Sequence, residues 1–236
     1  MDGELANRLD EAVSKLPEDL RELAVRDIEI LKRDVGLSWE KIIWILESES
    51  ADPTQRSTAA WIVGLVGEVS LAKILSSVVL ETREEQVLWE ITKTLCKLHQ
   101  GGPQFQEMLR NGPTLDHRKA SAYALGHLGD SASTVALTQV LSSRDEPLDL
   151  RCRAAEALGY LRDPTSLSAL LTAASDASAE VRFWSVFALG QLGDRRAAPL
   201  LEMLVQDDHA IVEGWWSVSQ EAAAALAEIG RAEETE

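Results

Sequence analysis

The sequence predicts an all-α fold, an α-solenoid of about six stacked helix pairs. Three observations lead to this prediction: a residue pattern that recurs along the chain, apolar residues at helical spacing, and glycines where helices would end. The pattern is clearest as Ala-Leu-Gly at 124–126, 157–159 and 188–190, with an arginine eight residues before each glycine and an aspartate four after it. Self-similarity of this kind indicates a repeat array, in which each unit buries its apolar face only against its neighbours.

We call the recurring glycine position the slot. It is filled by Gly64, Cys96, Gly126, Gly159, Gly190 and Ala227, so successive slots lie 32, 30, 33, 31 and 37 residues apart. A first helix is expected to run to about two residues past each slot, and a glycine one residue further on suits a left-handed C-cap. Those cap glycines are Gly67, Gly129, Gly193 and Gly230. A second, amphipathic helix follows in five units, at 71–80, 103–111, 133–143, 166–175 and 197–206.

The N-terminal residues predict three helices that lack the full pattern. The first covers 4–15, the second covers 17–36 between Pro17 and Gly36, and the third covers 39–49 with Ser38 as its N-cap. The second carries the apolar stripe Leu20, Leu23, Ala24, Ile28 and Leu31. We therefore expect residues 1–53 to form a degenerate capping repeat, 54–230 the repeat array and 231–236 an acidic tail.

The repeating unit resembles the HEAT repeat, in particular the short HEAT-like type associated with phycobilisome lyases. The resemblance covers roughly 54–230 and is most specific at 116–207. It weakens where Leu88, Cys96 and Gln100 replace the arginine, glycine and aspartate, and again in the last unit at Ser219, Ala227 and Arg231.

This resemblance implies a right-handed superhelix in which the second helices line a concave face where partners dock. It also implies a structural ladder, in which loop aspartates accept hydrogen bonds from arginines and backbone N–H groups of neighbouring units. The ladder residues are Arg56, Arg118, Arg151, Arg182, Asp130, Asp163 and Asp194.

Charge and composition exclude several classes of function. The formal net charge of -16 argues against binding nucleic acid or an anionic membrane, because both require a basic surface. No apolar run approaches membrane-spanning length, and no signal peptide is visible, so a cytoplasmic location with reduced Cys96 and Cys152 is expected. Residues 202–236 carry a net charge of -8, which suits a solubilising end or a docking site for a basic partner.

The sequence contains no recognisable catalytic constellation. None of the four histidines is followed by glutamate, so the paired His-Glu steps of di-iron HEAT-like hydroxylases are missing, and no nucleotide-binding or nucleophile motif occurs. We therefore expect no catalytic residues, no metal and no cofactor. The predicted function is a non-catalytic scaffold for a partner protein or peptide, as a monomer or weak homo-oligomer. The alternative is a lyase- or chaperone-like accessory factor for a tetrapyrrole-bearing or other client protein.

Two surfaces are candidates for the partner. One is the second-helix face, where Gln139, Thr172 and Met203 would point outward with small or uncharged neighbours. The other is the outer face of the first helices, defined by positions seven before, three before and one after the slot. Six of the twelve aromatic residues fall there: Trp61, Trp89, Tyr123, Tyr160, Phe183 and Phe187.

Exposed aromatic side chains in contact with one another require a cover. The cover is either a partner molecule or another part of the same chain. Trp184 is a further candidate for binding. So are Trp215 and Trp216: on a helix, the ring of one is expected to pack inward and the other to project outward. The alternative is that Gly214 breaks the helix and both rings plug the C-terminal end of the core.

Overall fold

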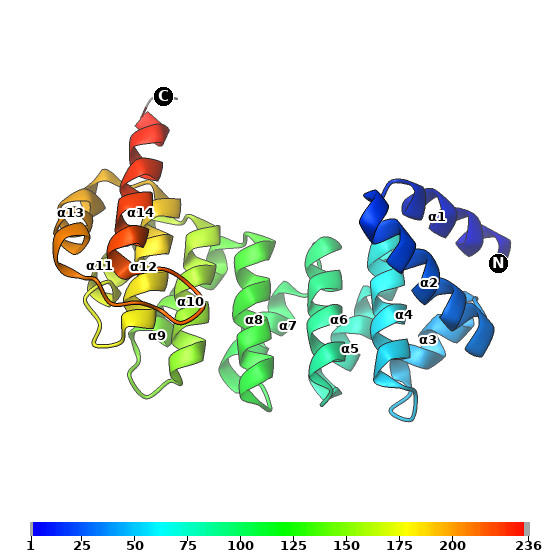
Figure 1. Ribbon diagram of the computed structural model, residues 1–236. Helices are drawn as coiled ribbons and strands as arrows, with labels where there is room; N and C mark the ends of the chain where they lie inside the picture. Colours follow the sequence, from blue (N-terminus) through cyan, green and yellow to red (C-terminus); the bar gives the residue numbers. More distant parts are fainter. Residues whose placement is uncertain (1, 234–236) are drawn as a thin grey trace. The chain divides into compact units, whose positions relative to one another are not determined.

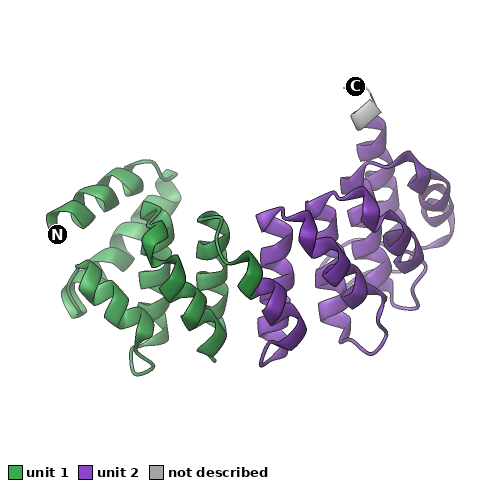
Figure 2. Cartoon of the chain, turned by 180° about the vertical axis from the view of Figure 1, so that it is seen from behind, with its two compact units in different colours: residues 1–104 green, residues 105–236 purple. Residues whose placement is uncertain are grey.

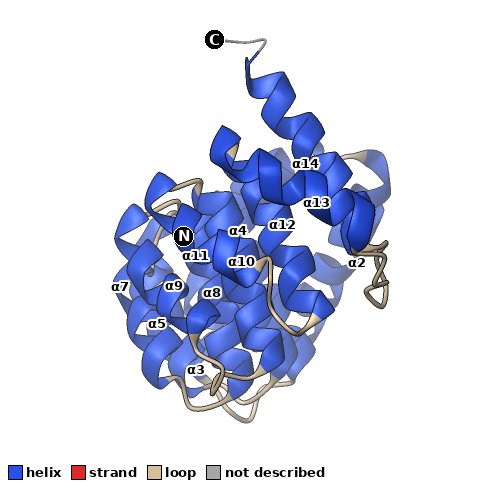
Figure 3. Ribbon diagram, turned by 90° about the vertical axis from the view of Figure 1, so that its left-hand side faces the viewer, coloured by secondary structure: helices blue, strands red, loops and turns tan. Residues whose placement is uncertain are grey.

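The computed structural model describes residues 2–233, which form two compact units, unit 1 (Met1–Gln104) and unit 2 (Phe105–Glu236) (Figure 2). The described residues form fourteen α-helices, four short 3-10 helices and no β-strand (Figure 3). The all-α prediction is confirmed. The boundary between the units lies inside the array predicted for 54–230, and residues 234–236 of the predicted tail lie outside the described residues.

In unit 1 three helices precede the repeats and pack around α4. The elements are α1 (Asp2–Ser14), α2 (Glu18–Asp34), α3 (Trp39–Glu47), α4 (Pro53–Val66), η1 (Val69–Leu71), α5 (Ala72–Glu81), α6 (Glu85–Lys97) and α7 (Gly102–Asn111), which crosses the boundary into unit 2. The three predicted N-terminal helices are confirmed, and Ser38 caps α3 by accepting the N–H of Lys41 at 3.3 Å.

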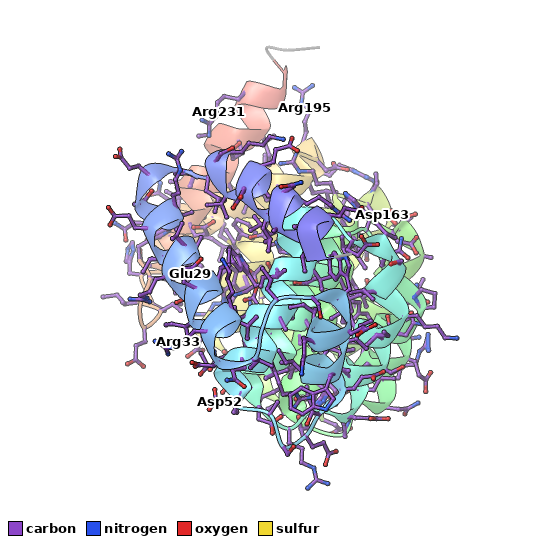
Figure 4. All side chains as sticks on the ribbon, turned by 90° about the vertical axis from the view of Figure 1, so that its right-hand side faces the viewer. Glu29, Arg33, Asp52, Asp163, Arg195 and Arg231 are labelled. Atoms are coloured by element: carbon purple, nitrogen blue, oxygen red, sulfur yellow. The ribbon has the colours of Figure 1, made fainter. Side chains whose placement is uncertain are left out.

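The apolar stripe predicted on α2 is only partly buried. Ala24, Ile28 and Leu31 are buried, whereas Leu20 and Leu23 remain about half exposed, because the neighbouring helices do not cover the whole stripe. Charged side chains occupy the outer side of α2, among them Glu29 and Arg33 (Figure 4).

Unit 2 stacks its helices in two layers (Figure 1). The first helices α8, α10, α12 and α14 pack side by side in that order, and α9, α11 and α13 pack against α10, α12 and α14. The elements are α8 (Leu115–Leu128), η2 (Ser131–Ser133), α9 (Thr134–Ser142), α10 (Leu148–Leu161), η3 (Pro164–Ser166), α11 (Leu167–Ala173), α12 (Ala179–Leu192), η4 (Arg195–Ala197), α13 (Ala198–Asp207) and α14 (Val218–Glu233). All five predicted second helices are present.

The turn inside each repeat follows from its sequence. Gly67, Gly129 and Gly193 end the first helices at φ values of 69°, 71° and 72°, the left-handed conformation that glycine adopts without strain. The fourth predicted cap is wrong, since Gly230 lies inside α14. In two units a non-glycine residue takes the left-handed position three residues after the slot: His99 at φ 53° and Arg162 at φ 51°.

The slot glycines bring neighbouring first helices into close contact. A Cβ built on Gly126 would lie 2.8 Å from the Cα of Ala157, and one on Gly190 would lie 2.8 Å from the Cα of Ala225. The alanine that faces each glycine lies two residues before the slot of the following unit, as Ala157 does for Gly159. Ala225 has the same position relative to Ala227, which supports Ala227 as the slot of the last unit. Backbones can approach this closely only where one side chain is missing.

The aspartates four residues after the slots and the arginines eight residues before them make different contacts. Asp130, Asp163 and Asp194 cap η2, η3 and η4, each by accepting the N–H two residues ahead. Asp163 also accepts a hydrogen bond of 2.8 Å from the hydroxyl of Thr134, which links it to the preceding repeat.

Each repeat arginine donates to a carboxylate in the loop before the next first helix. The pairs are Arg56 with Glu84, Arg118 with Glu146, Arg151 with Asp176 and Arg182 with Asp208, at 2.5–3.0 Å. Three of the arginines also donate to the carbonyl that ends the preceding second helix, at Leu46, Leu109 and Leu141. The resemblance implies that Asp130, Asp163 and Asp194 accept hydrogen bonds from these arginines. They do not, because each of them caps the 3-10 helix that follows it.

Candidate protein-binding surface

Eight rings in unit 2 form one connected row, which we call the aromatic surface. It starts on α8, crosses α10 and α12, and ends in the turn between α13 and α14. Its members are Tyr123, His127, Tyr160, Phe183, Trp184, Phe187, Trp215 and Trp216.

The rings along this row contact one another in sequence. His127 stacks on Tyr123 at 4.0 Å between centroids and meets Tyr160 at 4.8 Å, and Tyr160 meets Phe187 edge-on at 5.9 Å. These residues stand one after or three before their slots, so the row crosses from helix to helix at the same level of the repeat. Edge-to-face and offset contacts at these distances are favourable.

At the C-terminal end of the row, Trp215 and Trp216 lie in a turn and not in a helix. Gly214 adopts φ 79°, an isolated β-bridge joins Ile211 to Ser217, and α14 begins only at Val218. The expectation that one ring points inward and the other outward from a helix is therefore wrong, whereas the helix break at Gly214 given as the alternative is present. Both side chains are about half exposed, at 49% and 46%.

This turn covers Phe183. The Phe183 ring lies 5.8 Å from that of Trp215 and 6.1 Å from that of Trp216, and its residue is 1% exposed. Phe183 was expected on an outward face, and the added segment buries it. Trp184 and Phe187 stay partly exposed beside it.

A pocket of about 250 Å³ opens between these rings. Its walls come from α10, α12, α14 and the 208–217 turn, and they carry three carboxylates among the aromatic side chains. The lining residues that matter here are Tyr160, Trp184, Phe187, Trp215, Trp216, Glu156, Glu221 and Glu228. No lysine or arginine is among the described residues that line it.

The three carboxylates have different partners. Glu156 pairs with Arg153, and Glu228 accepts a hydrogen bond of 2.5 Å from Arg231, whose side chain projects from the end of unit 2 (Figure 4). Glu221 is 6% exposed and accepts a hydrogen bond of 2.7 Å from the indole N–H of Trp216. Burial, partly offset by this hydrogen bond, raises the pKa of the Glu221 carboxyl above its usual range.

The residues predicted on the second-helix face lie on three separate helices. Gln139 on α9, Thr172 on α11 and Met203 on α13 are exposed, and Met203 is half exposed. Thr172 donates its hydroxyl to the carbonyl of Ser168, within its own helix. No ring contact among the described residues joins this face to the aromatic surface.

Unit 1 contains a larger cavity of about 850 Å³ beside Arg56, Glu84, Glu47 and Glu81. Its walls are mainly charged and include the Arg56–Glu84 pair that links two repeats, so a smaller share of its lining is apolar than in the pocket of the aromatic surface. Within residues 2–233 no three His, Cys, Asp or Glu side chains are grouped to hold a metal ion, and no helix has the length and apolarity needed to cross a bilayer. Burial raises the pKa of the Cys96 and Cys152 thiols to about 12.

Comparisons with known proteins agree with this architecture. Residues 134–215 match the family model of HEAT repeats. The solved structure of the YibA protein of E. coli superposes with a TM-score of 0.56 at 16% identity, over 96% of this chain and 82% of that one. No curated protein sequence matches this chain.

Two further structures are similar at lower scores. The complex of CpcE and CpcF of phycocyanin lyase from Nostoc sp. PCC7120 matches with a TM-score of 0.47 and 19% identity, over 94% of each chain. A designed armadillo repeat protein in complex with the peptide (KR)4 matches with a TM-score of 0.48 and 16% identity, over 82% of this chain and all of that one. Residues 134–215 therefore carry HEAT-type repeats within an α-helical repeat fold, and the comparisons define the fold alone.

Proposed function

We propose that this chain is a non-catalytic scaffold that binds a partner protein, and that the aromatic surface of unit 2 is its docking site. The observation that carries the proposal is the unbroken row of rings from Tyr123 to Trp216, several of them half exposed. A soluble protein rarely leaves contiguous apolar area uncovered without a use for it. Tryptophan and tyrosine are also the side chains most enriched at the energetic centres of interfaces.

The composition of the surface fits a protein partner. Rigid rings lose little conformational entropy when they are covered, and the indole N–H and phenolic hydroxyl can still reach polar groups at the edge. The second-helix face offers Gln139, Thr172 and Met203 as separate exposed side chains, with no comparable cluster around them.

Affinity purification with matched variants tests the proposal. Wild-type chain, Trp215→Ala and Trp44→Ala are compared as baits, and a captured protein is then purified and its affinity measured by calorimetry. Trp44 is the control because it is also exposed, at 53%, but lies on α3 in unit 1. We expect Trp215→Ala to weaken binding of the purified partner by at least about tenfold and Trp44→Ala to leave it unchanged.

A second control separates the two candidate surfaces. Met203→Glu places a charge on the second-helix face, so a partner that docks there is lost with this variant and kept with Trp215→Ala. That result would contradict the assignment of the aromatic surface.

A further inference from the structure

The pocket in the aromatic surface has the features of a site for a cation. Trp184 stands 5.1 Å from Trp215 with their planes at 78°, and Trp215 stands 5.8 Å from Trp216 with planes at 79°. Phe187 closes the other side of Trp184 at 5.7 Å and 79°. Rings set nearly perpendicular to one another present both faces and edges to the space between them, and the faces attract positive charge.

Two tryptophans of unit 1 have a cation over the ring, whereas the three tryptophans of the pocket have none among the described residues. In unit 1, the guanidinium of Arg8 lies over Trp39 at 5.7 Å, and the ammonium of Lys41 lies over Trp44 at 6.0 Å. Among the described residues, no lysine or arginine lies over Trp184, Trp215 or Trp216. The ring faces of the pocket are therefore available to a cation from another molecule.

Glu221 supplies the matching negative charge. Its Oε2 accepts from the indole of Trp216, while Oε1 has no hydrogen-bond partner among the described residues. Unlike Glu156 and Glu228, it has no arginine beside it. A buried carboxylate without a counter-ion is costly, and an incoming cation would offset that cost.

We propose that this pocket binds the cationic side chain of a basic peptide segment on the partner: lysine, methylated lysine or arginine. The inference rests on the proposed function and names the chemistry that the docking site recognises. The rings contact the alkyl stem and the charged head, and Glu221 pairs with the head. A neutral apolar side chain of the same length would fill the space but leave the Glu221 carboxylate without a cation beside it. The net charge of -16 favours the approach of a basic segment.

Peptide titrations of the full chain test the proposal. The probe is one acetylated and amidated peptide, Ser-Gly-Ser-Xaa-Ser-Gly-Ser, in which Xaa is lysine, trimethyllysine, arginine or norleucine. Norleucine is the neutral control because it keeps the lysine stem without the ammonium. Binding is followed by tryptophan fluorescence and by NMR shifts of the indole N–H groups. We expect at least one cationic peptide to bind about tenfold more tightly than the norleucine peptide.

The three cationic arms identify the head group. Preference for trimethyllysine indicates recognition mainly by the ring faces, whereas preference for lysine or arginine indicates that a hydrogen bond to Glu221 dominates. Equal binding of all four peptides, or none at about 5 mM, overturns the proposal.

Variants of the chain locate the binding site. Glu221→Gln keeps the acceptor for Trp216 and removes the charge, so the advantage of the cationic peptides over norleucine should fall by several-fold. Trp184→Leu should reduce cation binding by about tenfold, and Trp44→Leu should not change it. If Trp184→Leu fails to fold, Glu221→Gln still decides, since unchanged cation preference in that variant contradicts the proposal.

The outcomes separate this inference from the proposed function. A purified partner that is lost with Trp215→Ala but binds Glu221→Gln normally supports the docking surface and rules out cation recognition. A second copy of this chain is the other possible occupant. Concentration-dependent dimerisation in analytical ultracentrifugation that disappears in Trp215→Ala would show self-association and overturn both.

Discussion

Replacing a slot glycine by alanine tests how the repeats are joined. In Gly126→Ala the new Cβ would lie 2.8 Å from the Cα, 3.0 Å from the Cβ and 3.1 Å from the carbonyl oxygen of Ala157. Ordinary contacts of a Cβ begin near 3.4 Å, so α8 and α10 must separate by roughly 0.6 Å, and backbone atoms cannot rotate out of the way. Overpacking of this kind costs about 1–3 kcal/mol.

The same substitution at Gly230 is the matched control. Gly230 lies inside α14, and among the described residues no atom outside its chain neighbours and its own helix backbone lies within 4 Å of its built Cβ, so alanine there gains only helix propensity, up to about 1 kcal/mol. Urea unfolding followed by far-UV circular dichroism gives the free energy of unfolding of both variants. We expect Gly126→Ala to be less stable than Gly230→Ala by about 1–3 kcal/mol. Equal stabilisation by the two substitutions would refute the close-approach explanation of the slot.

The remaining predictions concern the ion pairs and one strained cap. Arg151→Met leaves the nearly buried Asp176 carboxylate with the N–H of Ser178 but without its cation, and should lower the free energy of unfolding by up to about 3–5 kcal/mol. Arg196→Ala, at an exposed pair, should cost less than about 1 kcal/mol, and urea unfolding measures both. Hydrogen bonds from Arg182 lower the pKa of the Asp208 carboxyl in the folded state. The stability that this pair adds is therefore present above the unfolded carboxyl's pKa of about 3.9. It is lost as the pH falls through the lower pKa of the folded state. The free energy of unfolding should therefore fall more steeply on acidification in wild type than in Asp208→Asn, and parallel curves would contradict this. Arg162→Gly relieves the left-handed backbone at φ 51° and should raise the melting temperature, and a fall would show that its side-chain contact outweighs the strain.

Features that depend on local spacing were predictable from the chain alone. The repeat period, the second helices, and the caps at Gly67, Gly129 and Gly193 follow from residues within one or two helical turns of one another. The cap expected at Gly230 failed, since continued packing of α14 extends the helix past a residue that favours a turn elsewhere. The arginines of the repeat could be recognised in the same way, but their carboxylate partners lie 25–28 residues away and carry no fixed position relative to the slot.

The aromatic surface required the tertiary structure, although seven of its eight residues, all except His127, were named from the sequence. Periodicity placed Phe183 and Phe187 on one helix face but could not show that the 208–217 turn folds over Phe183. It also could not show that His127 links the rings of α8 to Tyr160 on α10. In the sequence Glu221 is one of many acidic residues of the C-terminal stretch. Only its burial and its hydrogen bond to Trp216 in the structure distinguish it from the others.

The physical reason is the range of the interactions. Helix periodicity and capping are set by neighbours in sequence, whereas a pocket is made by side chains from four separate segments whose distances depend on how the helices pack. The repeat pattern therefore determines the fold, and packing of the irregular C-terminal turn onto α12 determines where the aromatic surface and its pocket form.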